Sequence, residues 1–190
     1  MPVLLSDVAI FVAPLVVGLG LPALLNPGPY VQCGLKSPLQ PPGYVFGIVW
    51  TLLYALHGAS CAAAWTGANR KWTPGLVASF ATLAALAAWS IVFMNPAWCR
   101  PHYAYLAIVA VLGLVVGTVM LYVRQRSFLA ASLLVPLVAW MTFATYLSYS
   151  SVPLTELNFT NPANLLERNA YERFYSRQNL SPPLLPPLGI

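Results

Sequence analysis

The sequence predicts an all-α membrane protein built as a bundle of five transmembrane helices. Of its 190 residues, 59% are hydrophobic and only 7% are charged, whereas an average soluble domain has about 25% charged residues. The charged residues also fall in short gaps between long uncharged stretches, or toward the carboxyl terminus. A soluble fold of this size cannot cover its surface with so few charges, so the uncharged stretches are predicted to be membrane spans.

The five spans follow from the thickness of a bilayer. A hydrocarbon core about 30 Å thick requires about 20 consecutive apolar residues in a helix, and helices are favoured because each backbone amide must be satisfied within the membrane. Segments of that length lie at 8–25, 44–65, 76–94, 103–123 and 128–150. We therefore expect one transmembrane domain over 1–150, followed by a polar, Pro-rich tail over 151–190.

The first span and the connector after it contain many prolines. Pro14 lies inside the span, where it predicts a bend that neighbouring helices can accommodate. The 26–43 connector is rich in Pro and Gly and ends with Pro41 and Pro42, directly before the second span. It is predicted to be an ordered loop across the end of the bundle, serving as a lid over a cavity, or else an inert linker.

The third and fourth spans carry small residues at helical spacing. Gly113 and Gly117 form a G-x-x-x-G pair, and the third span has alanines four residues apart at Ala81, Ala84, Ala85 and Ala88. Small residues at this spacing let helix backbones approach closely. The pattern predicts close packing, either within one chain or across a homodimer seam.

The net charge of +5 arises from scattered residues and not from a basic run, which argues against nucleic-acid binding. It is more informative about topology. If the amino terminus and the 66–75 and 124–127 loops share one face, that face collects four basic residues: Arg70, Lys71, Arg124 and Arg126. The excess over the other face is small, so it favours a cytoplasmic amino terminus only weakly.

The spans contain little material for catalysis or ion coupling. No acidic residue lies inside a span, and His57 is the main ionisable group at depth, which excludes proton relays through carboxylates. A neutral His57 bonded to a neighbouring helix is favoured over a ligand for haem or metal. The three cysteines, Cys33, Cys61 and Cys99, lack metal-binding spacing and are expected to be free thiols. Neither a nucleophile with its base nor a Gly-rich phosphate loop is present.

The predicted spans are rich in aromatic residues. Phe46, Trp50 and Tyr54 lie on the second span, Trp89 and Phe93 on the third, and Trp140 and Phe143 on the fifth. Rings in a membrane bundle commonly fill the core or form interfacial belts. Trp50 and Trp140 lie too deep for a belt, so each indole N–H needs an internal partner or each ring lines a cavity. Such walls suit a flat, apolar ligand.

Two stretches resemble a known family. The first, residues 34–58, contains in order Lys36, Pro41-Pro42, Val49-Trp50, Leu53-Tyr54 and Gly58. The second, residues 134–147, reads Leu-Val-Pro-Leu-Val-Ala-Trp-Met-Thr-Phe-Ala-Thr-Tyr-Leu. Both are similar to the translocator protein family, also called peripheral benzodiazepine receptor or tryptophan-rich sensory protein, and they occur in the family's order.

The resemblance implies a five-helix integral membrane protein that binds, transports or senses porphyrin, haem and sterols such as cholesterol, or benzodiazepine-like compounds, with no cofactor or metal required. The expected ligand-binding residues are Phe46, Val49, Trp50, Leu53, Trp89, Phe93, Ala104, Ile108, Trp140, Phe143, Ala144 and Leu147. Lys36, Pro41 and Pro42 are expected in the lid. Trp140 and Ala144, four residues apart, would form one wall, with Leu147 continuing that face.

Two alternatives stay open. The chain can be a light-dependent porphyrin-degrading enzyme that uses Trp50, Trp89 and Trp140 as redox-active indoles, or a membrane scaffold with a vestigial pocket. Membrane lipid is the expected surrounding, and a homodimer is compatible with the small-residue faces. The family's usual addresses are the mitochondrial outer membrane in eukaryotes and the cell envelope in bacteria.

Overall fold

The structure, a computed structural model, describes residues 4–20, 23–24, 39–94 and 101–160, with side chains for all of these except 91–94, 101–102 and 151–160. This part of the chain is helical, without strands. The elements are α1 (Leu5–Leu15), the π-helix η1 (Val16–Gly20), α3 (Gly43–Gly67), α4 (Pro74–Met94), α5 (Pro101–Arg124), α6 (Phe128–Leu133) and α7 (Val135–Thr160). The predicted all-α fold is confirmed.

Several helices have the dimensions of membrane spans. Within the described residues, Gly43–Gly67, Tyr103–Arg124 and Phe128–Ser150 are long and apolar enough to cross a bilayer, and Leu5–Gly20 and Pro74–Ser90 are shorter apolar helices. Their outward surfaces are apolar as well, as at Leu5, which is 86% exposed. An apolar exterior of this kind is stable only in contact with lipid.

Prolines interrupt the first and last predicted spans. Pro14 lies in the last turn of α1, where it has no N–H to donate to the preceding turn, and the chain continues as the π-helix η1. The regular α-helix of this span therefore ends just after Pro14. In the fifth span, Leu134 separates α6 from α7, because Pro136 likewise cannot donate to the turn before it. α7 then continues to Thr160, ten residues beyond the predicted end at 150.

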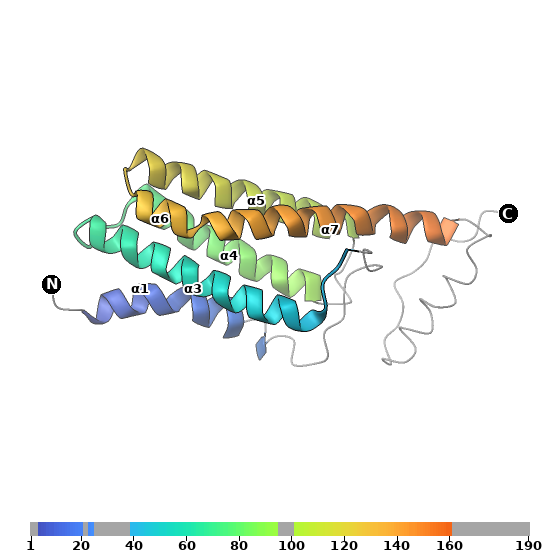
Figure 1. Cartoon of the computed structure of the whole chain (residues 1–190), viewed down its shortest axis with the longest axis horizontal. Helices are drawn as coiled ribbons and strands as arrows, with labels where there is room; N and C mark the ends of the chain where they lie inside the picture. Colours follow the sequence, from blue (N-terminus) through green and yellow to red (C-terminus); the bar gives the residue numbers. More distant parts are fainter. Residues whose placement is uncertain (1–3, 21–22, 25–38, 95–100, 161–190) are drawn as a thin grey trace.

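The helices run side by side along one long axis (Figure 1). α1 packs along α3, α4 along α5, and α5 along α7, while α6 closes against α3. The amino terminus, the α3–α4 loop and the α5–α6 loop lie together at one end of the bundle (Figure 1). This is the arrangement in which the loop cations Arg70, Lys71, Arg124 and Arg126 share a face.

Close contacts and polar bonds hold the helices together. Gly18 of η1 lies so near the ring of Tyr54 on α3 that a Cβ there would overlap it. Ser60 donates a hydrogen bond to the carbonyl of Ala130 at 2.7 Å, which ties α3 to α6. The hydroxyls of Thr82 and Thr118 lie 3.0 Å apart and join α4 to α5. Interhelical bonds between small hydroxyls are common in membrane bundles.

Candidate functional site

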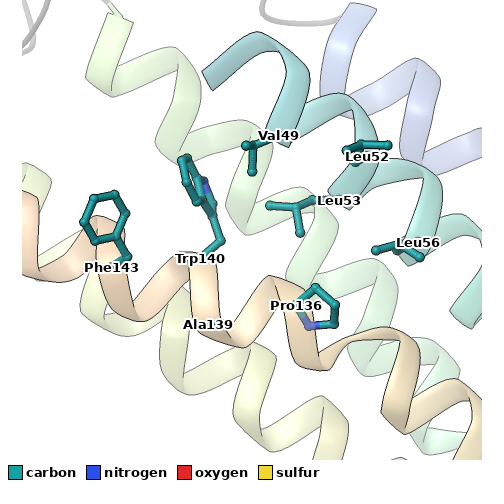
Figure 2. Close-up of a pocket in the computed structure, with 8 residues that line it drawn as sticks. All are labelled: Val49, Leu52, Leu53, Leu56, Pro136, Ala139, Trp140 and Phe143. Carbon is teal, nitrogen blue, oxygen red and sulfur yellow. The ribbon is translucent and has the colours of Figure 1, made fainter. Parts of the chain in front are cut away.

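An apolar groove lies between α3 and α7. α3 packs mainly against α1 and α6, and α7 packs mainly along α5, so α3 and α7 touch each other little and leave a space between them. The groove has a volume of about 460 Å³. It is lined by Val49, Leu52, Leu53, Leu56, Pro136, Ala139, Trp140 and Phe143 (Figure 2). None of these side chains is charged, so the groove suits an apolar ligand.

Trp140 is the centre of an aromatic cluster at this groove. Its ring rises from α7 toward α3 (Figure 2) and lies 5.5 Å from Phe46 and 5.6 Å from Phe143 between ring centroids. Trp50 lies 6.5 Å from Trp140, in an edge-to-face arrangement, and 6.3 Å from Trp89 on α4. These distances fall in the range where aromatic rings attract one another. Three helices thus supply one continuous aromatic wall.

The packing of α1 fixes the position of Trp50. The ring of Tyr54 stacks on Trp50, with centroids 5.5 Å apart and an interplanar angle of 25°. Tyr54 is in turn held by the close approach of Gly18 in η1. In the first span, Pro14 is followed by a π-helix that contains Gly18. This π-helix influences the aromatic cluster through two contacts, from Gly18 to Tyr54 and from Tyr54 to Trp50.

The indole nitrogen of Trp140 is buried and has no hydrogen-bond partner among the described residues. A buried donor left without an acceptor is unfavourable, and in proteins of known structure such groups are rare. Because this nitrogen is buried, a ligand in the groove would meet the ring of Trp140 and not its N–H. The site is therefore an extended apolar wall.

The predicted ligand-binding residues fall into three groups. Val49, Leu53, Trp140 and Phe143 line the groove. Phe46, Trp50 and Trp89 belong to the aromatic cluster that adjoins it. Ala104, Ile108, Ala144 and Leu147 are buried on α5 and α7 and are not part of the groove lining.

The structure describes only some of the remaining predicted residues. Phe93 lies on α4, but its side chain is outside the described residues, as is the whole of Lys36. Pro41 and Pro42 immediately precede α3, and Pro42 is its N-cap residue, with φ −55° and ψ 147°. Most of the predicted lid, 26–43, lies outside the described residues, so its role stays a prediction.

Sequence reasoning missed four lining residues, namely Leu52, Leu56, Pro136 and Ala139. A signal for them was available. The lining positions on α3 are 49, 52, 53 and 56, and those on α7 are 136, 139, 140 and 143. Both sets follow the i, i+3, i+4, i+7 spacing of a single helix face. Extending the face of Val49 and the face of Trp140 by one turn would have found all four.

The buried polar groups lie elsewhere in the bundle and serve packing. His57 Nε2 and Ser79 Oγ lie 2.8 Å apart, which links α3 to α4 and confirms that this histidine is bonded to a neighbouring helix. Cys61 is a free, buried thiol 3.3 Å from the same hydroxyl. Within the described residues no three metal-ligating side chains lie together.

The fold and the groove together define a class: helical integral membrane proteins that carry an aromatic-walled, uncharged recess between their helices. Comparison with known proteins gives the family. The model of the TspO/MBR family matches residues 10–153, so the chain belongs to this family.

Two curated relatives agree with that assignment. Translocator protein 2 of Mus musculus is 28% identical over 116 residues, which cover 60% of this chain and 71% of the relative. Tryptophan-rich protein TspO of Archaeoglobus fulgidus is 32% identical over 120 residues, which cover 62% of this chain and 74% of the relative. The matched length extends over most of the helical bundle, and the resemblance seen in the two sequence stretches is confirmed.

Proposed function

We propose that this protein binds a flat, largely apolar molecule, such as a tetrapyrrole or a sterol, in the groove between α3 and α7, and that it acts as a membrane transporter or sensor of that molecule. In this proposal all five apolar segments cross the bilayer. The observation that carries it is the groove itself, an uncharged space lined on one side by Trp140 and Phe143.

The lining favours ligands that reach the site from the bilayer. Leu52 is 59% exposed and Val135, beside the lining residue Pro136, is 55% exposed, so the groove opens toward the lipid. A ligand dissolved in the membrane can enter such a groove without passing through water. Its apolar rings would replace lipid chains against Trp140.

Filling the groove tests the proposal. Ala139 lines the groove and is exposed, so Ala139→Phe places a ring in the ligand space without disturbing the core. Thr142→Phe is the matched control, because Thr142 is exposed on the same helix but is not a lining residue. We expect Ala139→Phe to weaken binding of protoporphyrin or cholesterol by at least about fivefold, since steric filling costs about 1–3 kcal/mol.

Binding is best followed by the shift of porphyrin absorption and by competition with cholesterol, with melting temperatures measured alongside. The control should bind like the wild type. Equal affinity in wild type, Ala139→Phe and Thr142→Phe would show that the ligand does not occupy this groove. If the wild type binds no flat apolar ligand, the proposal is wrong and the alternative of a membrane scaffold with a vestigial pocket is favoured.

A second candidate function is light-dependent degradation of porphyrin. It is favoured by the contact of three indoles, because Trp50 touches both Trp89 and Trp140. A porphyrin in the groove would lie against Trp140, at one edge of this group. Illumination of the complex decides between the two: loss of the porphyrin absorption in wild type, but not in Trp140→Phe, supports the enzyme, whereas stable absorption supports the binder.

A further inference from the structure

The end of the bundle that holds the amino terminus carries exposed cations with no acidic partner among the described residues. Asp7 is the only acidic residue whose side chain the structure describes. Its two oxygens accept hydrogen bonds from Arg70 at 2.9 and 2.8 Å, from Trp65 Nε1 at 3.2 Å and from the Leu4 backbone at 3.0 Å. Asp7 therefore neutralises Arg70 and has no capacity left for a second cation.

The three neighbouring cations stay available. Lys71, Arg124 and Arg126 are exposed and form no ion pair with a described residue. They lie on two loops that meet, because a Cβ built on Gly75 after the first loop would come within 2.8 Å of Gln125 Oε1 in the second. The bundle thus ends in a small surface of net positive charge.

Apolar side chains border these cations on the side of the membrane. Trp72 is 60% exposed, Phe128 is 64% exposed and Leu129 is 65% exposed, and each is within three residues of one of the cations. Trp72 is held in place by the rings of Trp65 and Phe80, at centroid distances of 5.9 and 5.6 Å. Exposed aromatic rings next to basic side chains match the headgroup region of a bilayer, where the rings sit below the phosphates.

The backbone conformation of Arg126 also supports a role for its charge. Arg126 has φ 58°, in the left-handed region that glycine adopts at little cost. Its loop closes α5 with a hydrogen bond from Ser127 N to Tyr122 O at 2.9 Å, a geometry in which glycine is the commonest residue. An arginine at this position makes the loop less stable than glycine would, but it places an exposed positive charge at this end of the bundle.

We propose that Lys71, Arg124 and Arg126, bordered by Trp72 and Phe128, form a binding site for the headgroups of anionic phospholipids. The charge is complementary, the cations are unpaired, and the adjoining rings fit the interface. Juxtamembrane basic residues attract anionic lipid over a Debye length and lose this attraction in high salt. Binding at this site would orient the protein so that this end of the bundle lies at the leaflet richer in anionic lipid.

A lipid titration of the full chain in neutral detergent tests this. Melting temperature is followed while phosphatidylglycerol or phosphatidylcholine with the same acyl chains is added. We expect phosphatidylglycerol to stabilise the wild type at much lower concentrations than phosphatidylcholine, and high salt to remove the difference. Replacing all three cations with Gln should raise the concentration needed by about fivefold for each charge removed, while Lys71→Arg with Arg124→Lys and Arg126→Lys should retain the response.

Arg126→Gly separates lipid binding from stability. Because the backbone there favours glycine, this variant should melt in phosphatidylcholine at the wild-type temperature or above, yet respond about fivefold more weakly to phosphatidylglycerol. Equal responses to the two lipids in wild type, or an unchanged phosphatidylglycerol response in the triple Gln variant, would overturn the proposal. The same response to inorganic phosphate as to phosphatidylglycerol would also overturn it, since the site would then be one for free anions.

Discussion

Gly58 lies at a close approach of α3 to α1. A Cβ at this position would overlap the backbone carbonyl oxygen of Phe11, which cannot rotate away as a side chain would. Gly47, on the same helix, has nothing within 4 Å of the corresponding position. The two glycines therefore have opposite roles: the first permits a helix contact, and the second is an exposed helical position with no steric requirement.

This difference gives a paired prediction. Gly58→Ala should lower the free energy of unfolding by about 1–3 kcal/mol, because α1 must shift to accept the methyl group. Gly47→Ala should raise it by about 0.5–1 kcal/mol, because alanine is the better helix former. Thermal unfolding in the same detergent measures both. A Gly58→Ala variant as stable as Gly47→Ala would mean that α1 does not pack against α3 at this point.

At the scale of elements, the bond network of Asp7 fastens the start of α1 to the loop after α3. Four hydrogen bonds to a carboxylate hold its pKa well below the usual range, chiefly through the hydrogen bond from Arg70. The same bond raises the pKa of Arg70. A carboxyl whose folded pKa is depressed stabilises the fold above its unfolded pKa of about 3.9, and this contribution is lost as the pH falls toward the folded value.

The expected consequence is a stability difference that depends on pH. Asp7→Asn should melt below the wild type at pH 7, and the gap should persist down to about pH 4 and then narrow in stronger acid. Arg70→Gln provides the check, because the folded pKa of Asp7 should then lie nearer its unfolded value and the acid-induced loss of stability should be smaller than in the wild type. Parallel melting curves for wild type and Asp7→Asn at every pH would show that this network contributes nothing.

For the whole molecule, the sequence was a good guide to the elements and a weaker guide to how they pair. The positions of the apolar helices followed from hydropathy, because the bilayer sets the length of an apolar helix. The continuation of α7 to Thr160 was missed, since a helix leaving the membrane becomes polar and no longer stands out by hydropathy. The break at Leu134 was also missed, although Pro136 was a signal for it.

The candidate site was predicted in part. Aromatic spacing identified Phe46, Trp50, Trp89, Trp140 and Phe143, which the fold brings together. Which helix faces which neighbour was not available from any single helix, because α3 and α7 are separated by two other spans along the chain. The groove itself depends on that pairing, whereas Leu52 and Leu56 could have been found by extending the face of Val49 along α3.

The outward face of α5 carries two glycines four residues apart, Gly113 and Gly117. A Cβ at Gly113 or Gly117 would meet nothing within 4 Å, so these glycines do not mediate packing against any other described part of the chain. Gly113→Leu with Gly117→Leu should therefore fold and bind ligand like the wild type, with helix propensity giving a gain of up to about 1 kcal/mol for each substitution. Small residues four apart remain suited to a seam between two copies. If that seam forms, the variant should have half the apparent mass of the wild type in lipid nanodiscs, by light scattering. A wild type that is monomeric at every concentration would exclude the seam, and a variant that fails to fold would show that this face is buried inside the bundle.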